Sequence, residues 1–115
     1  MKKFLVVLLL SSVFILPFCT SSKKTARSSA PKISYMTDVQ PIVSTNCTPC
    51  HFPPKGNKKP YDTYAAVKGD IDSIIVRISK NPGEKGFMPV KHPKLSDSLI
   101  HVFVQWKQDG LLETR

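Results

Sequence analysis

Two cysteines followed directly by a histidine constrain this 115-residue chain more than any other feature of its sequence. Cys47, Cys50 and His51 form the string Cys-Thr-Pro-Cys-His, and Cys19 is the one remaining cysteine. On one helical turn, two thiols at this spacing can each add to a vinyl group of the same porphyrin, and the adjacent imidazole can bind the iron. The string therefore predicts one covalently attached haem c per chain.

Three other interpretations of the cysteine pair fit the sequence less well. A thioredoxin-like redox pair would lie in a βαβ pattern, which does not surround Cys47, and it would not need His51. A closed zinc site would need further ligands, and His92 and His101 are distant and come without a second cysteine pair. A structural disulfide between Cys47 and Cys50 would close a short, strained ring that stabilises little.

A haem iron bound on one side by His51 either takes a second protein ligand or keeps that position open. Met88 stands in a segment rich in glycine and proline, which can bend around a flat cofactor, and we predict that Met88 is the second axial ligand. His92 is the reserve candidate. Met36 is expected to pack in the core, and His101 is expected to face water from the last helix.

The spacing of apolar residues predicts an all-α fold of about four short helices. A capping-box pattern spans residues 37–40, and Pro41 falls within the first turn of the helix that this box would start. The last helix should cross the first. The expected caps of the four helices are Thr37, Asp62, Asp70 and Ser96, and the expected stops of the last three are Gly69, Asn81-Pro82-Gly83 and Gly110.

Residues 1–18 are typical of a secretory signal peptide, because Lys2 and Lys3 precede an apolar run over residues 4–16. At about 1.5 Å per residue this run spans about 20 Å, short of the roughly 30 Å hydrocarbon core, which disfavours a permanent membrane span. Leu16-Pro17-Phe18-Cys19 resembles a lipobox, although Phe18 is bulkier than the small residue usual before the modified cysteine. Cys19 is therefore the candidate lipid attachment site; its removal with the signal is the alternative.

Residues 19–32 are expected to form a flexible, lipidated tether, and residues 33–115 a single domain. The tether is rich in serine, threonine and basic residues, and it cannot bury enough apolar area to order itself. The chain has a net charge of +9, but residues 33–115 hold eleven basic and eight acidic residues, a net charge of +3. We expect a monomer on the periplasmic or cell-surface side of a bacterial membrane, anchored there by its lipid. Nucleic acid is not an expected partner.

Taken together, these residues resemble the small single-haem class I cytochromes c, in particular the short cytochrome c domains of bacterial exported proteins and lipoproteins. The resemblance covers residues 35 to about 112 and implies a haem held by Cys47 and Cys50, axial ligation by His51 and Met88, and electron transfer. His51 and Met88 are 37 residues apart, a shorter interval than in mitochondrial-type members. The motifs that carry the resemblance are Asp38-Val39-Gln40-Pro41-Ile42, the Cys-Thr-Pro-Cys-His string, Phe87-Met88-Pro89 and Leu95-Ser96-Asp97.

We expect this protein to be an electron carrier. We do not expect it to be an enzyme, because the sequence contains no catalytic triad, paired-carboxylate motif or phosphate loop. Two alternatives stay open: an enzyme or sensor of peroxide or gases in which Met88 detaches, and a fixed redox subunit of a membrane complex. The basic loop at residues 55–59 could dock an acidic redox partner. Because the apolar core is thin, we expect the haem-free chain to be largely unfolded.

Overall fold

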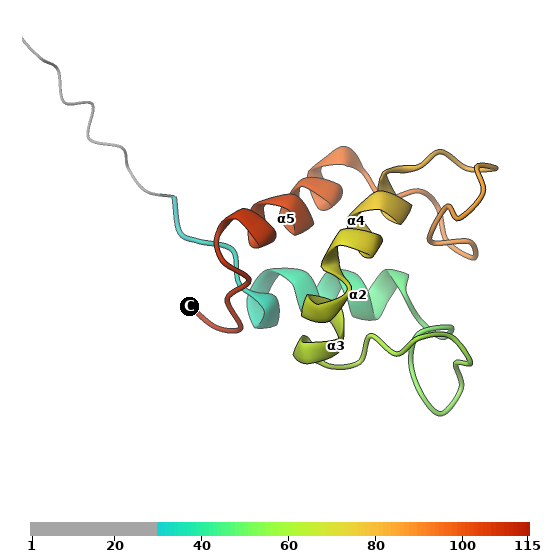
Figure 1. The fold of residues 1–115 in the computed structure, drawn as a ribbon, viewed down its shortest axis with the longest axis horizontal. Helices are drawn as coiled ribbons and strands as arrows, with labels where there is room; N and C mark the ends of the chain where they lie inside the picture. Colours follow the sequence, from blue (N-terminus) through green and yellow to red (C-terminus); the bar gives the residue numbers. More distant parts are fainter. Residues whose placement is uncertain (1–29) are drawn as a thin grey trace, which may run out of the picture.

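The computed structural model describes residues 30–115, a helical region that contains no strand. Its first helix begins as a π-helix, η1 (Tyr35–Val39), and continues as α2 (Gln40–Asn46) (Figure 1). Three more follow: α3 (Tyr64–Gly69), α4 (Ile71–Ser79) and α5 (Asp97–Gln108). The all-α prediction is confirmed for this part of the chain. The predicted signal peptide and Cys19 lie outside the described residues.

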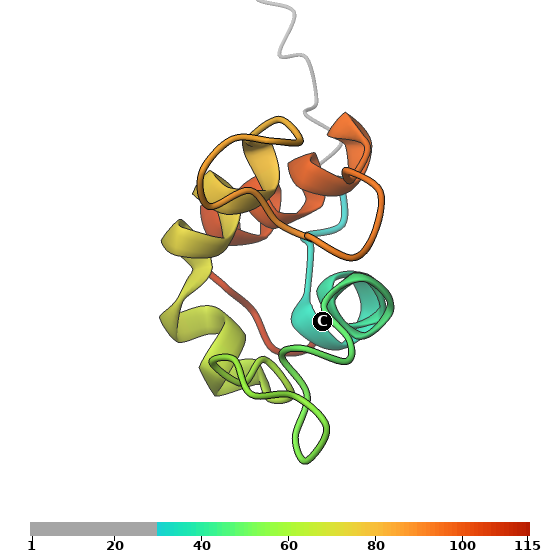
Figure 2. The same ribbon diagram turned by 90° about the vertical axis from the view of Figure 1, so that its right-hand side faces the viewer.

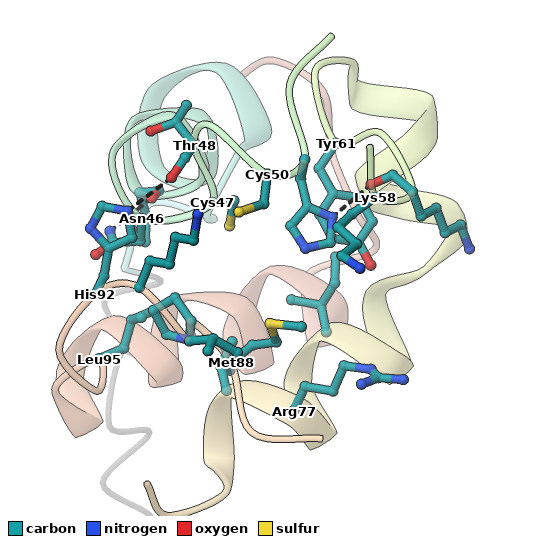
Figure 3. A pocket seen from close by; sticks show the side chains of 18 of the residues that line it. Asn46, Cys47, Thr48, Cys50, Lys58, Tyr61, Arg77, Met88, His92 and Leu95 are labelled. Atoms are coloured by element: carbon teal, nitrogen blue, oxygen red, sulfur yellow. Dashed lines mark hydrogen bonds between the residues drawn. The ribbon is translucent and has the colours of Figure 1, made fainter. Parts of the chain in front are cut away.

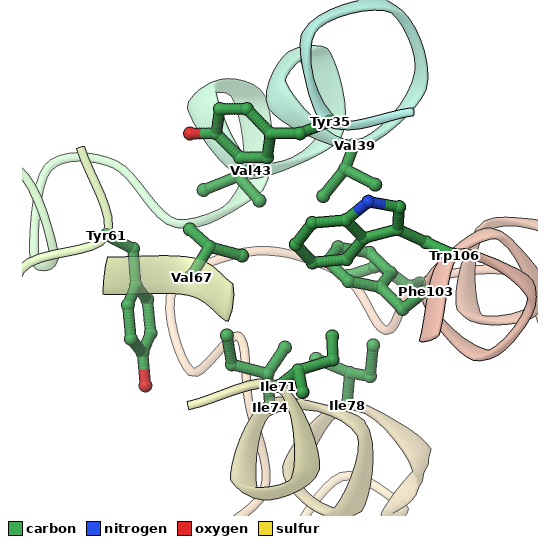
Figure 4. Packing of buried hydrophobic residues seen from close by; sticks show 11 residues of the cluster. Tyr35, Val39, Val43, Tyr61, Val67, Ile71, Ile74, Ile78, Phe103 and Trp106 are labelled. Atoms are coloured by element: carbon green, nitrogen blue, oxygen red, sulfur yellow. The ribbon is translucent and has the colours of Figure 1, made fainter. Parts of the chain in front are cut away.

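The helices meet in a common core to which each contributes (Figure 4). In the first helix, Tyr35, Val39 and Val43 recur every four residues and are buried. Phe103 and Trp106 of α5 are buried against them, and the Tyr35 and Trp106 rings lie 5.9 Å apart. The expected packing of the last helix on the first is thus formed. From α4, Ile71, Ile74 and Ile78 complete the core. Together with the half-buried Ile75, they are the four isoleucines whose spacing in the sequence predicts this helix.

The first helix starts earlier than the capping-box pattern predicts. Its N-cap is Ser34, whose backbone N–H donates to Asp38 Oδ2 at 2.7 Å. The prediction that Thr37 caps this helix was wrong, because Asp38 reaches back to the upstream serine. The prediction that Met36 packs in the core was also wrong. With Tyr35 facing the core, the helical rotation turns Met36 toward solvent, where it is 49% exposed.

Pro41 accounts for the π-helical start of this helix. Proline has no backbone N–H, and its ring crowds the carbonyl group four residues earlier. The preceding turn is accordingly widened: the N–H groups of Val39 and Gln40 donate to carbonyl oxygens five residues back, those of Ser34 and Tyr35. The helix then narrows to an α-helix that leads directly into the cysteine pair.

The caps of the later helices agree in part with the sequence prediction. Ser96 Oγ accepts from Leu99 N–H at 3.4 Å, as expected for the cap of α5. Thr63, and not Asp62, caps α3, because its Oγ1 accepts from the Ala66 N–H at 3.3 Å. Asp70 stands at the N-cap of α4, where its backbone carbonyl accepts from the Ile74 N–H at 2.9 Å, but its side chain forms no cap hydrogen bond with that helix. Its carboxylate turns toward the loop before α3 instead.

The segment after α5 closes the fold by running back beside the start of the first helix. Gly110, with φ +97°, ends α5 in the left-handed conformation that glycine adopts readily. The carbonyl of Leu112 then accepts from both the Tyr35 N–H and the Trp106 Nε1–H, each at 2.8 Å. Tyr64 OH donates to the neighbouring Leu111 carbonyl at 2.7 Å. These bonds tie η1, α3 and α5 to one short tail.

Two long loops lie at the same end of the helices. The loop between α2 and α3, coloured green, and the loop between α4 and α5, coloured orange, both project to the right in Figure 1 and face the viewer in Figure 2. The first loop contains the cysteine pair and the second contains Met88. Among residues 30–115 no helix is long and apolar enough to cross a membrane.

Candidate cofactor site

A cavity of about 680 Å³ opens between these two loops. Its volume falls within the range of roughly 300–1,000 Å³ that is typical of small-molecule and cofactor sites. The walls come from the end of α2, the loop that follows it, one face of α4, the second long loop and one residue of α5. The residues predicted to hold a haem all line this cavity, and so does the reserve ligand: Cys47, Cys50, His51, Met88 and His92.

The two cysteines lie on the turn that continues α2. The N–H of Cys47 donates to the Val43 carbonyl at 2.9 Å, and the N–H of His51 donates to the Cys47 carbonyl at 3.0 Å. Both thiols are free and partly buried, and their sulfur atoms project into the cavity (Figure 3). Burial raises the pKa of Cys47 to about 11, so this side chain is a neutral thiol at pH 7.

One hydrogen bond decides the chemistry of His51. Its Nδ1 lies 2.6 Å from the backbone carbonyl oxygen of Lys59. A carbonyl oxygen can only accept, so Nδ1 carries the proton and donates. In the neutral imidazole the Nε2 atom then keeps its lone pair. This is the tautomer that metal-ligating histidines adopt when a backbone carbonyl orients the ring.

Tyr61 and Asp70 support the same histidine. The rings of Tyr61 and His51 are stacked, with centroids 4.4 Å apart and planes inclined by 10°. Tyr61 OH donates to Asp70 Oδ2, and Asp70 Oδ1 pairs with Lys59 Nζ at 2.7 Å. Burial, followed by the hydrogen bond to Asp70, raises the pKa of Tyr61. Burial alone would raise the pKa of Asp70, but hydrogen bonds from Lys59 and Tyr61 and the charge of Arg77 outweigh it and lower that pKa.

Met88 lies across the cavity from the two cysteines (Figure 3). Its N–H donates to the Arg77 carbonyl at 3.2 Å, which fastens the second long loop to the end of α4. Gly83 and Gly86 turn this loop with φ angles of +93° and +85°, in the region that favours glycine. The expectation that glycine lets this segment bend is confirmed.

His92 is held in a different way. Its Nε2 lies 2.8 Å from the Thr48 carbonyl oxygen, so Nε2 carries the proton here. The bond clips the loop that contains Met88 to the segment that contains the cysteines. His101 is exposed on α5, as predicted, and does not line the cavity.

Gly56 does not line the cavity but packs against the cysteine turn, and the sequence analysis did not single it out. A Cβ atom at this position would lie 2.2 Å from the Cys50 carbonyl oxygen and 2.5 Å from that of Pro49. Only glycine therefore permits the loop to fold this closely onto the cysteine turn. Tyr61 and Asp70 were missed as site residues for a related reason, since contacts made through folded loops leave no local pattern in the sequence.

The described part of the chain holds no cluster of three or more His, Cys, Asp or Glu side chains that could bind a metal ion. Comparisons of the chain with protein-family models, with curated proteins and with solved structures found no match.

Proposed function

We propose that this protein is a c-type cytochrome that carries single electrons, with one haem c attached through Cys47 and Cys50. His51 and Met88 would be the axial ligands of its iron. One observation carries the proposal. Two thiols at the haem-attachment spacing line the same cavity as an imidazole whose Nε2 lone pair is available. The fold would then be a small class I cytochrome c domain.

The donor set suits a haem better than a bare metal ion. A porphyrin supplies four equatorial nitrogen ligands, so an imidazole and a thioether suffice to complete the coordination. The thiols of Cys47 and Cys50 supply the covalent attachment. Apolar side chains from three elements offer a surface for a flat macrocycle: Ile74, Ile78, Leu95 and Phe103. When bound, the haem supplies a one-electron ferrous/ferric couple.

The two axial residues favour electron transfer over catalysis. With His51 and Met88 both ligating, the protein leaves no coordination position for a substrate. A thioether sulfur favours the ferrous state relative to a second imidazole, so Met88 would raise the reduction potential above that of a His51/His92 pair. The Met88 N–H donates to the Arg77 carbonyl, a bond that would hold the backbone of this ligand at the end of α4.

Covalent haem attachment also fits the proposed location. We propose that residues 1–18 direct export and that Cys19 receives the lipid, which would place the cytochrome on the periplasmic or cell-surface side of a bacterial membrane. Attachment of haem to cysteines takes place outside the cytoplasm, so export and haem binding are mutually consistent.

A basic rim surrounds the cavity and suggests an acidic redox partner. Three exposed basic residues that line the cavity form this rim: Lys58, Arg77 and Lys91. Lys58 and Arg77 are labelled in Figure 3, and Lys59 is instead paired with Asp70. Such a rim steers an anionic partner by long-range attraction that salt screens. We propose that the docking surface includes Arg77 and Lys91 in addition to the 55–59 loop.

The rim can be tested with hexacyanoferrate(III), a small anionic oxidant. The reduced Lys58→Glu/Lys91→Glu variant should be oxidised more slowly than the unmodified protein, and the rate should depend less on ionic strength. The matched control is Lys68→Glu/Lys85→Glu, which makes the same change in net charge at two residues that do not line the cavity. Equal slowing by both variants would contradict a local effect of the rim.

The haem proposal is tested by mass spectrometry of the mature protein, exported from cells that possess the cytochrome maturation machinery. The unmodified chain should carry one haem and an N-terminal lipid. The Cys47→Ser/Cys50→Ser variant should carry the lipid but no haem, and Cys19→Ser should carry the haem but no lipid. A colourless, haem-free product from the unmodified chain would refute the proposal.

A further inference from the structure

The carboxylate of Asp70 is diverted from the role that its position suggests. An aspartate at an N-cap normally accepts hydrogen bonds from the first turn of its own helix. Asp70 makes no such bond with α4; its two oxygen atoms take the Tyr61 hydroxyl and the Lys59 ammonium instead. The Asp70 side chain is 17% exposed, so the carboxylate is largely sheltered from water, whereas the Lys59 side chain that it binds is 60% exposed.

The two partners of Asp70 are the two residues that hold His51. The Lys59 backbone carbonyl accepts the Nδ1–H of His51 at 2.6 Å, and the Tyr61 ring stacks on the imidazole. The Tyr61 N–H also donates to the His51 carbonyl at 2.9 Å. Asp70 thus closes a ring of contacts that runs from the imidazole edge through Lys59 and Tyr61 and back to the imidazole face.

We propose that Asp70 is a positioning residue for His51: by binding Lys59 and Tyr61 together, it sets the orientation of the imidazole and the strength of its Nδ1–H bond. This inference rests on the proposed ligation of a haem iron by His51. Asp70 lines the cavity. It would act on the imidazole through Lys59 and Tyr61, which take its hydrogen bonds, and on the iron through its charge.

The direction of the effect on the reduction potential follows from charge and hydrogen bonding. A carboxylate near the site favours the more positive ferric state, and a firm Nδ1–H bond makes the imidazole a more basic ligand, which favours the same state. Loss of Asp70 removes both influences. The reduction potential of Asp70→Asn should therefore lie above that of the unmodified protein.

The experiment compares the haem-loaded protein with Asp70→Asn, Tyr61→Phe and the double variant. Potentiometry should show an upward shift for Asp70→Asn, a smaller one for Tyr61→Phe, which keeps the charge, and a double-variant shift below the sum. NMR of the ferrous protein should show exchange of the His51 Nδ1–H with solvent at least about tenfold faster in Asp70→Asn. If Asp70→Asn does not accumulate in cells, the reduction potential and the Nδ1–H exchange rate are measured on Tyr61→Phe instead.

Asp72→Asn is the matched control, because Asp72 lies two residues further along α4 and is also ion-paired, with Lys107. It removes the same charge away from His51 and should leave the Nδ1–H exchange rate unchanged. Equal potential shifts for the Asp70 and Asp72 variants, or unchanged exchange in both Asp70→Asn and Tyr61→Phe, would overturn the positioning role. An unmodified chain without covalent haem would overturn the proposed function first, before any variant is compared.

Discussion

Two histidines beside one cavity are held in opposite tautomers by backbone carbonyl groups. His51 donates from Nδ1 to Lys59, and His92 donates from Nε2 to Thr48. The residue type is the same at both positions, so the difference comes from the carbonyl oxygen that each ring contacts. His51 keeps a lone pair on Nε2 and is the candidate iron ligand, whereas His92 uses its Nε2–H to join two loops. The sequence predicts which residues gather at the site, but it does not predict which nitrogen is left with a lone pair.

Gly56 offers a sharp test of the loop packing beside the cysteine turn. Gly56→Ala should lower the free energy of unfolding by roughly 1–3 kcal/mol and reduce the yield of covalent haem, because the new Cβ meets the backbone of Pro49 and Cys50. Denaturant unfolding and haem absorbance measure the two effects. The control Gly69→Ala meets no heavy atom within 4 Å and should be neutral or slightly stabilising. Equal behaviour of the two variants would contradict the close approach.

Met88 and His92 can be separated spectroscopically. The ferric unmodified protein and His92→Ala should both show the weak red-edge band expected of methionine sulfur on ferric iron. Met88→Ala should lose this band, bind added imidazole and have a lower reduction potential, because the thioether that favours ferrous iron is gone. A high-spin ferric spectrum of the unmodified protein at neutral pH would instead favour the open-site sensor or enzyme.

At the scale of helices, apolar spacing proves more informative than capping motifs. Of the apolar residues whose spacing predicts α4, Ile71, Ile74 and Ile78 are buried and Ile75 is half-buried. In α5, Phe103 and Trp106 are buried, while Leu99 and Val102 are half-buried. Caps were predicted less well because several neighbouring side chains can fill the same role. Which of them does so depends on where the chain approaches from, as the diverted carboxylate of Asp70 illustrates.

The cap of α3 can be tested by comparing two adjacent residues. Thr63→Ala should cost about 0.5–2 kcal/mol in the free energy of unfolding, because it removes the acceptor for the Ala66 N–H. Asp62→Ala, which changes the cap expected from the sequence, should cost less. Chemical denaturation of the haem-loaded proteins measures both. The reverse order would show that Asp62 is the cap that stabilises α3.

At the scale of the whole molecule, the cavity is lined by side chains of α2, α4 and α5 and of the two long loops. We expect the Cys47→Ser/Cys50→Ser variant to be largely unfolded, because a buried macrocycle supplies apolar area at about 25 cal/mol per Å² that the small core lacks. Circular dichroism should show much less helix than in Cys19→Ser, which keeps both haem-binding thiols. Native helicity in the haem-free variant would contradict this.

The Asp109 carboxylate joins segments near the two ends of the described region, and we expect it to make the stability depend on pH. Asp109 Oδ2 accepts from the Ile33 N–H at 2.7 Å and Oδ1 accepts from Gln105 Nε2 at 2.8 Å. The backbone bond from Ile33 is the main cause that lowers the Asp109 pKa, and the Gln105 bond adds to it. A depressed folded-state pKa contributes stability above the unfolded value of about 3.9, and this is lost as pH falls through the folded value.

Asp109→Asn should therefore be less stable than the unmodified protein at neutral pH, and the difference should shrink as the pH falls below about 4. Urea unfolding midpoints measured from neutral to acid pH test this. Two curves that remain parallel over the whole range would show that the carboxylate makes no charge-dependent contribution.

The sequence by itself determined the helical class, the apolar faces and the short list of candidate site residues, because periodicity and motif spacing are properties of neighbouring positions. Only the tertiary structure decided that Met88 lies opposite the cysteines, that Lys59 and Tyr61 orient His51, that Gly56 must lack a side chain and that Asp70 joins two loop residues. Those relations depend on loop paths and on backbone carbonyl groups that every residue possesses. No side-chain pattern records them until the chain has folded.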